Sequence, residues 1–339
     1  MISKRGHEAL GSNDEHFWAI ILAGGEGTRL RPLMRSLYGD ERPKQFAPLL
    51  GSRSLLRASL DRSGRKVPLE RTVVVTSRWH ARYVAEEFAS SPRPKILVQP
   101  RDRGTASGVL FPMHWIQGRD PEAVVAVFPS DHFIADESTF MEHVGSLMRL
   151  ASRHPGLLLL VGAQPDRPEC DYGWVEPGDA LEEGSDVRRV RGFVEKPDPG
   201  RARSCFESGG LWNTFVLVGT AGAFAEAGRR CLPDLDAEIT RVSPFFHTPS
   251  EERMIERGYA AAPTADFSRG VLEKSPQSLA VSRLPHVGWS DLGTPQRVML
   301  RLAPNLEPSR LSGWAPAWAL GAAGTDAATS GRPSPRALQ

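Results

Sequence analysis

The chain has 339 residues, of which 40% are hydrophobic and 24% are charged, the mixture of a soluble globular protein with one large domain or two of ordinary size. Its 42 Lys and Arg residues nearly balance 40 Asp and Glu residues, and a net charge of +2 argues against nucleic acid or an anionic membrane as a partner. The three cysteines include no Cys-x-x-Cys pair, and no apolar stretch could span a bilayer or serve as a secretory signal. We therefore expect a cytoplasmic enzyme or ligand-binding protein.

The order of apolar segments along the chain predicts an α/β fold. Residues 1–16 are polar and are expected to form a loose lead-in. Short continuous apolar runs, typical of buried strands, follow at residues 17–22, 72–76, 96–98, 124–128, 157–161 and 215–218. Stretches with helical spacing lie between several of them, at residues 54–60, 79–88 and 140–151. This alternation predicts a Rossmann-like mixed, mainly parallel sheet with helices on both faces.

The composition changes near the end of the chain. Residues 301–339 form an Ala/Gly/Pro/Ser-rich tail, and from Gly313 onward its only large apolar side chains are Trp314 and Trp318. Such a segment buries too little apolar surface to offset the entropy lost on ordering, so we expect it to be mostly disordered. Residues 17–300 are then expected to form the folded domain.

In a parallel sheet, ligands bind beyond the carboxyl ends of the strands, and the first such segment is rich in glycine. Gly24, Gly25 and Gly27 follow the first apolar run and are followed by Arg29. Backbone N–H groups of such a turn can approach phosphates closely. The spacing is neither that of a Walker A loop nor that of a dinucleotide-binding loop. A glycine turn after a strand is, taken alone, most often only a turn.

Two further segments carry candidate phosphate and metal groups. Lys44 lies in the sequence Arg-Pro-Lys-Gln-Phe at 42–46, where the alternative is a solvated lysine in a surface loop. Asp131 follows the apolar run at 124–128, which places a carboxylate where a magnesium ligand belongs. The alternative is that Ser130 or Asp131 caps a helix or turn. His132 alone indicates a packed or capping histidine.

The second half of the chain adds segments that are weak when taken singly, since Glu-Lys pairs and Asn or Asp beside Gly are common in turns. They lie at residues 165–176, 193–197, 211–214, 271–274 and 288–293.

The order of these segments resembles that of the sugar-phosphate nucleotidyltransferases. The segments that carry the resemblance lie at residues 24–33, 43–46, 103–106, 129–132, 172–173, 195–197, 211–213 and 289–293. Pro-Lys-Gln-Phe at 43–46 and the run from Arg167 to Gly173 look most like the mannose-1-phosphate guanylyltransferases. The resemblance covers about residues 17–300 and implies the nucleotidyltransferase fold, with a sugar-binding portion inserted in the second half.

The resemblance also implies roles for single residues. Arg29, Lys44 and Asp131 would be catalytic, with Arg29 on the triphosphate and Lys44 facing the phosphates. The nucleotide would be bound by Leu22, Ala23, Gly24, Gly25, Gly27, Thr28, Gln99, Gly104 and Thr105. The sugar and its phosphate would be held by Gly173, Glu195, Lys196 and Asn213. Asp131 and Asp291 would bind Mg²⁺, the expected cofactor.

The implied reaction is Mg²⁺-assisted in-line attack of mannose 1-phosphate on GTP, giving GDP-mannose for polysaccharide synthesis and pyrophosphate. Alternatives are the same chemistry with dTTP or ATP and glucose 1-phosphate, or a non-catalytic subunit that senses sugar nucleotides. A dinucleotide-dependent oxidoreductase is disfavoured, because Leu30 stands where its third glycine would be. The resemblance leaves a homodimer open, and a short stub over residues 270–300 could mediate it.

Two segments depart from the family pattern. Residues 99–106 read Gln-Pro-Arg-Asp-Arg-Gly-Thr-Ala where the family usually has Glu-Pro-x-x-Arg-Asn-Thr-Ala, which bears on base discrimination. Residues 212–215 read Trp-Asn-Thr-Phe where Trp-Asn-Ser-Gly is usual, which bears on the floor of the sugar pocket.

Overall fold

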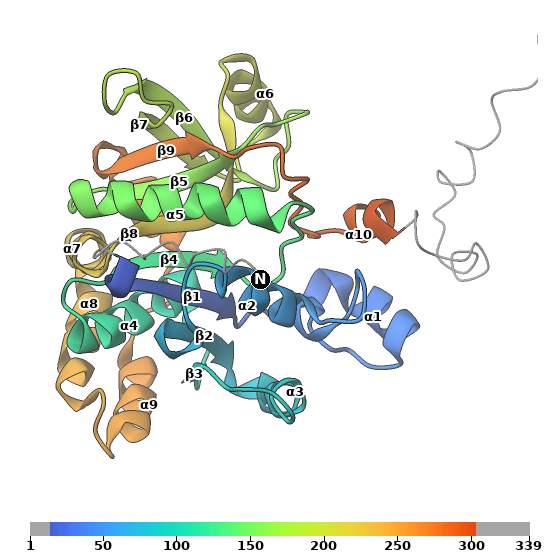
Figure 1. The fold of residues 1–339 in the computed structure, drawn as a ribbon, viewed down its shortest axis with the longest axis vertical. Coiled ribbons are helices and arrows are strands. Elements are labelled where there is room, and N and C mark those ends of the chain that lie inside the picture. The colour runs from blue at the N-terminus through green and yellow to red at the C-terminus, as the bar shows by residue number, and fades with distance from the viewer. Residues whose placement is uncertain (1–13, 303–339) are drawn as a thin grey trace, which may run out of the picture.

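The computed structural model describes residues 14–302, which form a nine-stranded sheet flanked by helices (Figure 1). The strands follow the order β3-β2-β1-β4-β8-β5-β9-β7-β6. Their bounds are β1 Phe17–Ala23, β2 Thr72–Ser77, β3 Lys95–Gln99, β4 Val124–Pro129, β5 Leu158–Ala163, β6 Gly173–Ala180, β7 Arg188–Glu195, β8 Leu211–Thr220 and β9 Leu279–Arg283. The predicted disordered tail, including Trp314 and Trp318, lies outside the described residues except for its first two positions.

Ten α-helices connect and cover the strands within the described part of the chain. They are α1 Arg31–Tyr38, α2 Leu55–Ser63, α3 Ala81–Glu87, α4 Gly104–Arg119, α5 Glu137–Arg153, α6 Pro199–Glu207, α7 Ala221–Cys231, α8 Pro233–Val242, α9 Glu251–Ala261 and α10 Pro295–Leu302. Three single-turn helices matter for the site: Thr28–Leu30, Lys44–Phe46 and Arg78–His80. None of the described helices is both long and apolar enough to cross a bilayer.

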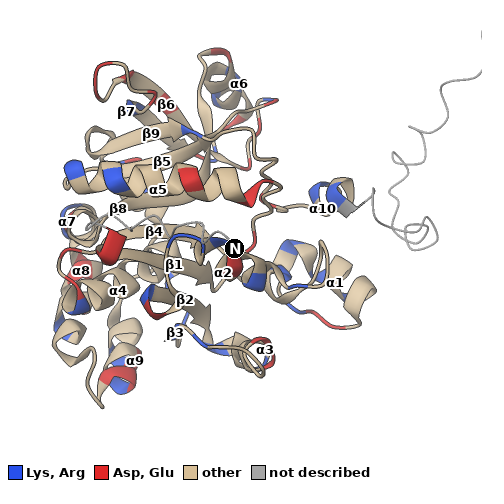
Figure 2. Ribbon diagram, in the orientation of Figure 1, with Lys and Arg blue, Asp and Glu red and all other residues tan. Residues whose placement is uncertain are grey.

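Both faces of the sheet are covered, which explains why its central strands are apolar throughout. Successive side chains of β1 point to opposite faces, so Ile20 joins a core with α4 and α7, while Ala19 joins a core with α5. Figure 2 shows the consequence: Lys, Arg, Asp and Glu lie on helices, loops and outer strands, and β1, β2 and β4 carry none. The predicted α/β sheet with helices on both faces is confirmed.

The mainly parallel character holds for only half of the sheet. Strands β3, β2, β1 and β4 are mutually parallel. Beyond β4, the pairs β4–β8, β8–β5, β9–β7 and β7–β6 are antiparallel, and β5–β9 is parallel. Strands β6 and β7 were not predicted, because their exposed faces interrupt the apolar pattern with polar residues.

Two predicted boundaries need correction. Part of the stub predicted over residues 270–300 belongs to the body of the domain, because β9 lies inside the sheet between β5 and β7 with four of its five side chains buried. The lead-in is not loose up to residue 16, since Asp14–His16 forms a turn of 3₁₀ helix. There His16 Nδ1 lies 2.9 Å from Asp120 Oδ1 on the body of the domain.

Candidate active site

The glycine turn after β1 is held in place by the segment 43–46. Gln45 Nε2 donates to the carbonyl oxygens of Ala23, at 3.1 Å, and Gly25, at 2.8 Å. Within residues 14–302, the amide N–H groups of Gly25, Glu26 and Gly27 donate no hydrogen bond. The turn is therefore a fixed set of free donors beside a strand end, which suits an anion.

A cavity of about 280 Å³ opens beside this turn, at the carboxyl ends of β1, β2 and β3. Six of the residues predicted to bind the nucleotide line it: Leu22, Gly24, Gly25, Gln99, Gly104 and Thr105. Ala23, Gly27 and Thr28 do not line this cavity. Ala23 lies in β1, with its carbonyl held by Gln45, while Gly27 and Thr28 lead into the next turn of helix. Sequence reasoning missed Trp79 and Asp266, which also line the cavity.

Gly104 is required for the far wall of this cavity. Its φ of +77° is in the left-handed region, and a Cβ there would lie 2.3 Å from the carbonyl oxygen of Ala265. This close approach lets Thr105 Oγ1 donate to Asp266 Oδ2 at 3.0 Å. The glycine that replaces the family's usual asparagine thus has a packing reason.

Lys44 is buried, and its ammonium joins three parts of the site. Nζ lies 3.2 Å from Asp131 Oδ2 and donates to the carbonyl oxygens of Asp291, at 2.6 Å, and Leu292, at 3.2 Å. The residue is 8% exposed, so the alternative of a solvated loop lysine is wrong. The lysine brings the strand-end aspartate and the segment 288–293 together, as the shared site requires.

The Asp291 carboxylate is bound by groups of this chain. Oδ1 accepts from Tyr172 Oη at 2.8 Å, and Arg297 NH1 lies 3.2 Å from Oδ1 and 3.1 Å from Oδ2. Burial is the largest single influence and raises the pKa of Asp291, but the charges of Arg297 and Lys44 and the Tyr172 hydrogen bond are among the influences that together hold the pKa below its usual range. Arg297, on α10, carries no motif by which the sequence could have revealed it.

The residues that flank Asp131 are structural. Ser130 Oγ donates to the carbonyl oxygen of Leu22 at 2.7 Å, which ties the ends of β1 and β4, and Asp136 is the residue that caps α5. The alternative of a cap at Ser130 or Asp131 is therefore wrong. His132 accepts from Trp289 Nε1 at 3.2 Å, and burial lowers its pKa to about 4. It is the packed histidine that the sequence indicated.

Three of the predicted sugar-binding residues meet in the second half of the sheet. A Cβ on Gly173 would lie 2.6 Å from Glu195 Oε2 and 3.4 Å from Asn213 Cβ. Burial raises the pKa of Glu195. Lys196 is half-exposed next to it, with Nζ 3.7 Å from Glu195 Oε1. Glu273 lies in the segment 271–274, for which no role was predicted. The Glu273 carboxylate accepts the backbone N–H of Glu195 at 2.8 Å.

The departure at residues 214–215 leaves a strained position beside this group. Phe215 has φ of +57°, a left-handed conformation that favours glycine, and glycine is the usual family residue there. Asn213 Oδ1 accepts the Phe215 N–H at 3.0 Å and so stabilises the strained turn. The side-chain oxygen of Asn213 is therefore already used in a hydrogen bond to the backbone.

Arg29 lies in the single helical turn Thr28–Leu30 that follows the glycine turn, and its side chain is largely exposed. Its NH1 lies 3.6 Å from Asp171 Oδ2, and its side chain is 59% exposed. A surface ion pair of this kind is weak, so the guanidinium is free to move to a ligand.

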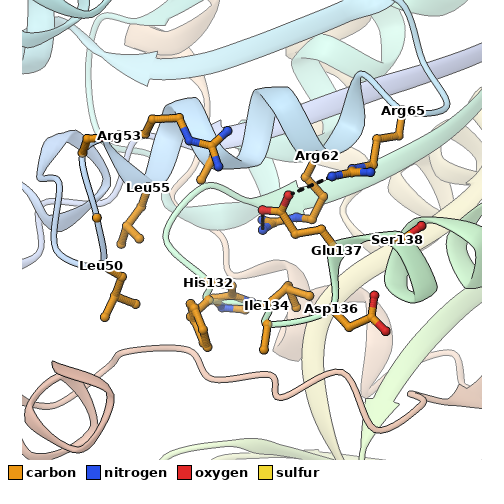
Figure 3. A pocket seen from close by; sticks show the side chains of 15 residues that line it. Leu50, Arg53, Leu55, Arg62, Arg65, His132, Ile134, Asp136, Glu137 and Ser138 are labelled. Atoms are coloured by element: carbon orange, nitrogen blue, oxygen red, sulfur yellow. Dashed lines mark hydrogen bonds and ion pairs between the residues drawn. The ribbon is translucent and has the colours of Figure 1, made fainter. Parts of the chain in front are cut away.

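A larger cavity, of about 650 Å³, lies away from these residues, between α2 and the segment 132–138 (Figure 3). Its lining begins at His132, next to Asp131, and does not include Asp131 itself. Its arginines are already paired: Arg62 NH1 and Arg65 NH2 lie 3.5 Å and 3.6 Å from the Glu137 carboxylate. The predicted site residues do not line it.

Comparison with known proteins assigns the family. Residues 18–303 match the family described as nucleotidyl transferase. The chain belongs to the nucleotidyl transferase family. A mannose-1-phosphate guanylyltransferase of Escherichia coli K12 is 31% identical over 285 residues, covering 82% of this chain and 58% of that protein. The xanthan biosynthesis protein XanB of Xanthomonas campestris pv. campestris strain B100 is 31% identical over 279 residues, 81% of this chain and 57% of XanB. The chain thus spans under two thirds of these curated relatives.

Solved structures of nucleotidyl transferase relatives share the fold. A structure titled mannose-1-phosphate geranyltransferase, from Thermus thermophilus, is 30% identical, with a TM-score of 0.71 over 86% of this chain and 80% of that one. A glucose-1-phosphate thymidylyltransferase from Bacillus anthracis, described as putative in its title, has 16% identity and a TM-score of 0.55, which shows the fold alone. The predicted family and fold are confirmed.

The donor set of this nucleotidyl transferase fits Mg²⁺ in type and number. Within residues 14–302 no three acidic, His or Cys side chains gather as a metal cluster. Two carboxylates are enough for Mg²⁺, which takes its remaining ligands from phosphates and water. Asp131 pairs with Lys44 through Oδ2, while its Oδ1 lies 3.9 Å from His132 Nε2, and the side chain is 30% exposed. Asp291 would have to exchange its Arg297 contact for the ion.

Proposed function

We propose that this chain transfers a nucleotidyl group from a nucleoside triphosphate, GTP by preference, to a hexose 1-phosphate, mannose 1-phosphate by preference, with Mg²⁺ as cofactor. The observation that carries the proposal is the buried Lys44 ammonium, which pairs with the Asp131 carboxylate and donates to the Asp291 carbonyl, so that the strand-end aspartate and the segment 288–293 meet at one positive charge. The relatives named above support GTP and mannose.

Each group has a task in the proposed reaction. A phosphate oxygen of the hexose 1-phosphate forms a bond to the α-phosphorus, and the bond from that phosphorus to the bridging oxygen of pyrophosphate breaks on the opposite side. The free amides of the turn and the mobile Arg29 bind the triphosphate. Lys44 offsets negative charge on the phosphates at the join between the halves. The attacking phosphate is already an anion, so no general base is needed.

The metal would be held by Asp131 and Asp291. When bound, Mg²⁺ polarises a phosphoryl oxygen and aligns the phosphates. In its absence Lys44 and Arg297 compensate the two carboxylates, which keeps them in place for the substrate complex.

The test is a substrate screen that follows pyrophosphate release. GTP, ATP, dTTP and UTP are each combined with mannose 1-phosphate and glucose 1-phosphate, and the Asp131→Asn variant purified in parallel controls for contaminating enzymes. We expect GTP with mannose 1-phosphate to turn over fastest. A faster dTTP or ATP pair with glucose 1-phosphate would overturn the specificity. No release with any pair, together with measurable nucleotide binding, would favour the sensing subunit instead.

A further inference from the structure

Trp79 is an exposed indole at the nucleoside cavity to which neither the sequence motifs nor the proposed reaction gives a task. It is 74% exposed, the largest value among the exposed large hydrophobic side chains of residues 14–302. Burial normally favours such a side chain by about 2 kcal/mol, so full exposure of an indole is costly unless something covers it. Within the described residues its ring stacks on no other aromatic ring and its N–H donates no hydrogen bond.

The backbone around Trp79 belongs to an ordered turn that is held by contacts of the neighbouring residues. Trp79 lies in the single helical turn Arg78–His80 that follows β2, and Ser77 Oγ accepts its backbone N–H at 3.4 Å. On one side, Arg78 pairs with Glu256 of α9 at 2.8 Å. On the other, His80 is buried, lies 3.3 Å from the Ala23 carbonyl and packs edge-on against Phe46 at 5.5 Å. The buried His80 anchors this turn, whereas the exposed Arg78 pair adds little, and the Trp79 indole beside them remains exposed.

The lining of the cavity beside this turn suits a flat group with polar edges. Its lining includes the glycines of the turn after β1 and Gly108 of α4, whose backbones present little side-chain bulk, and the apolar Leu22 and Val75. Polar atoms that could meet the edges of a base come from Gln99, Thr105 and Asp266. Trp79 is the only aromatic side chain among the lining residues of this cavity.

We propose that Trp79 is the stacking wall that covers the base of the nucleoside triphosphate and favours a purine over a pyrimidine. This inference rests on the proposed function and specifies how its nucleotide is selected. An indole over a base gains dispersion energy and excludes water, and the gain grows with the area of overlap, which is larger for the two fused rings of a purine. Base stacking on an aromatic side chain tolerates any base, so Trp79 would bias the choice and leave finer recognition to the polar edge groups.

The kinetic test compares Trp79→Ala, Trp79→Phe and, as control, Phe245→Ala, another exposed aromatic residue that lies outside this cavity. We expect Trp79→Ala to raise KM for GTP or ATP by roughly 5- to 150-fold, the range of losing one base–aromatic stack. KM for UTP or dTTP should rise less, and KM for the hexose 1-phosphate should stay within about 2-fold, since only uniform binding of the base is lost. Trp79→Phe should keep most of the affinity, and Phe245→Ala should match the wild type.

A binding test needs no turnover. Acrylamide quenching of tryptophan fluorescence in the wild type, minus that in Trp79→Phe, reports access to the Trp79 ring, and GTP or ATP should reduce that access. Nucleotide binding that leaves Trp79 fully accessible, or wild-type KM values in Trp79→Ala, would overturn the stacking wall and indicate that another partner covers the indole. Failure of the proposed function is separate: wild-type protein would then release no pyrophosphate from any substrate pair.

Discussion

At the scale of single residues, the site depends on a few side chains whose surroundings decide what they do. Lys44 would be a common surface residue in another setting. Here it is buried against two backbone carbonyls and one carboxylate, so its charge is held at a fixed place in the site. The next two residues have structural roles. Gln45 holds the glycine turn through its side-chain amide, and the Phe46 ring stacks on the Tyr83 ring with 5.5 Å between the ring centroids.

Replacing Lys44 by Met should reduce turnover more than it reduces stability. Met keeps the aliphatic stem but removes the ammonium, so we expect turnover to fall by about 100-fold or more, the scale of losing one group that stabilises developing charge. The two orphaned carbonyls should cost roughly 1–3 kcal/mol of unfolding free energy. Urea denaturation and initial rates of pyrophosphate release measure the two effects. Lys66→Met, which removes an ion pair with Glu142, is the control, and wild-type turnover in Lys44→Met would contradict the role.

His132 should make the protein less stable in acid. Burial lowers its folded-state pKa to about 4, against 6.5 for an unfolded histidine. Between these values the unfolded state binds more protons, so stability is complete above pH 6.5 and falls as the pH drops toward 4, by up to about 1.4 kcal/mol per pH unit. His132→Gln should make this fall less steep in urea titrations over about pH 4–7. His286→Gln removes an exposed histidine, and an equal effect there would refute the assignment.

At the scale of elements, the proposed reaction would place the two substrates on different halves of one sheet. The parallel strands β1, β2 and β3 end at the nucleoside cavity, as expected where strand ends leave backbone groups free. The sugar group is built on β6, β7 and β8, which are antiparallel to one another where they pair, and Gly173, Glu195 and Asn213 meet there across strand pairs. Antiparallel pairing thus brings together residues that lie far apart along the chain.

Gly173→Ala should affect the sugar substrate selectively. The new Cβ would lie 2.6 Å from Glu195 Oε2 and 3.0 Å from Phe193 Cζ, so Glu195 must move. A displacement of this size at a positioning group costs roughly 10- to 100-fold, and we expect it in KM for the hexose 1-phosphate and not in KM for the triphosphate. Gly156→Ala meets nothing within 4 Å and is the matched control. A rise in KM for both substrates would indicate that the whole sheet is disturbed.

At the scale of the whole molecule, the last described segments close the site. α10 packs on α1 through a cluster that includes Leu33, Met34 and Val298, and Figure 1 shows the two helices on the same side of the molecule. Arg297 of α10 then reaches both Asp291 and Glu169, the latter at 2.7 Å. The last described helix thus packs against the first one, and the Asp131 and Asp291 carboxylates each have a positively charged partner before any ligand binds.

Removal of divalent cations should therefore abolish turnover without unfolding the protein. Lys44 and Arg297 compensate the Asp131 and Asp291 carboxylates, so the fold does not depend on an ion between them. We expect EDTA to stop pyrophosphate release, excess Mg²⁺ to restore it, and the thermal midpoint of ligand-free protein to change by no more than about 2 °C, equivalent to about 1 kcal/mol for a domain of this size. A large drop in the midpoint with EDTA would show a structural metal.

The sequence by itself determined the α/β class, the buried strands of the first half and most of the residues at the nucleoside cavity. Buried strands appear as continuous apolar runs, and residues just after them, such as Gly24 and Asp131, must lie at one edge of the sheet. Only the tertiary structure decided how the charges are paired. Lys44 bonds to a carbonyl 247 positions away, and Arg297 to Glu169 across 128 positions. No local pattern encodes such contacts, because they depend on where the sheet and α10 bring distant segments together. The same holds for Trp79, whose spacing indicates only a helix and whose exposure at a cavity appears only once three strand ends lie side by side.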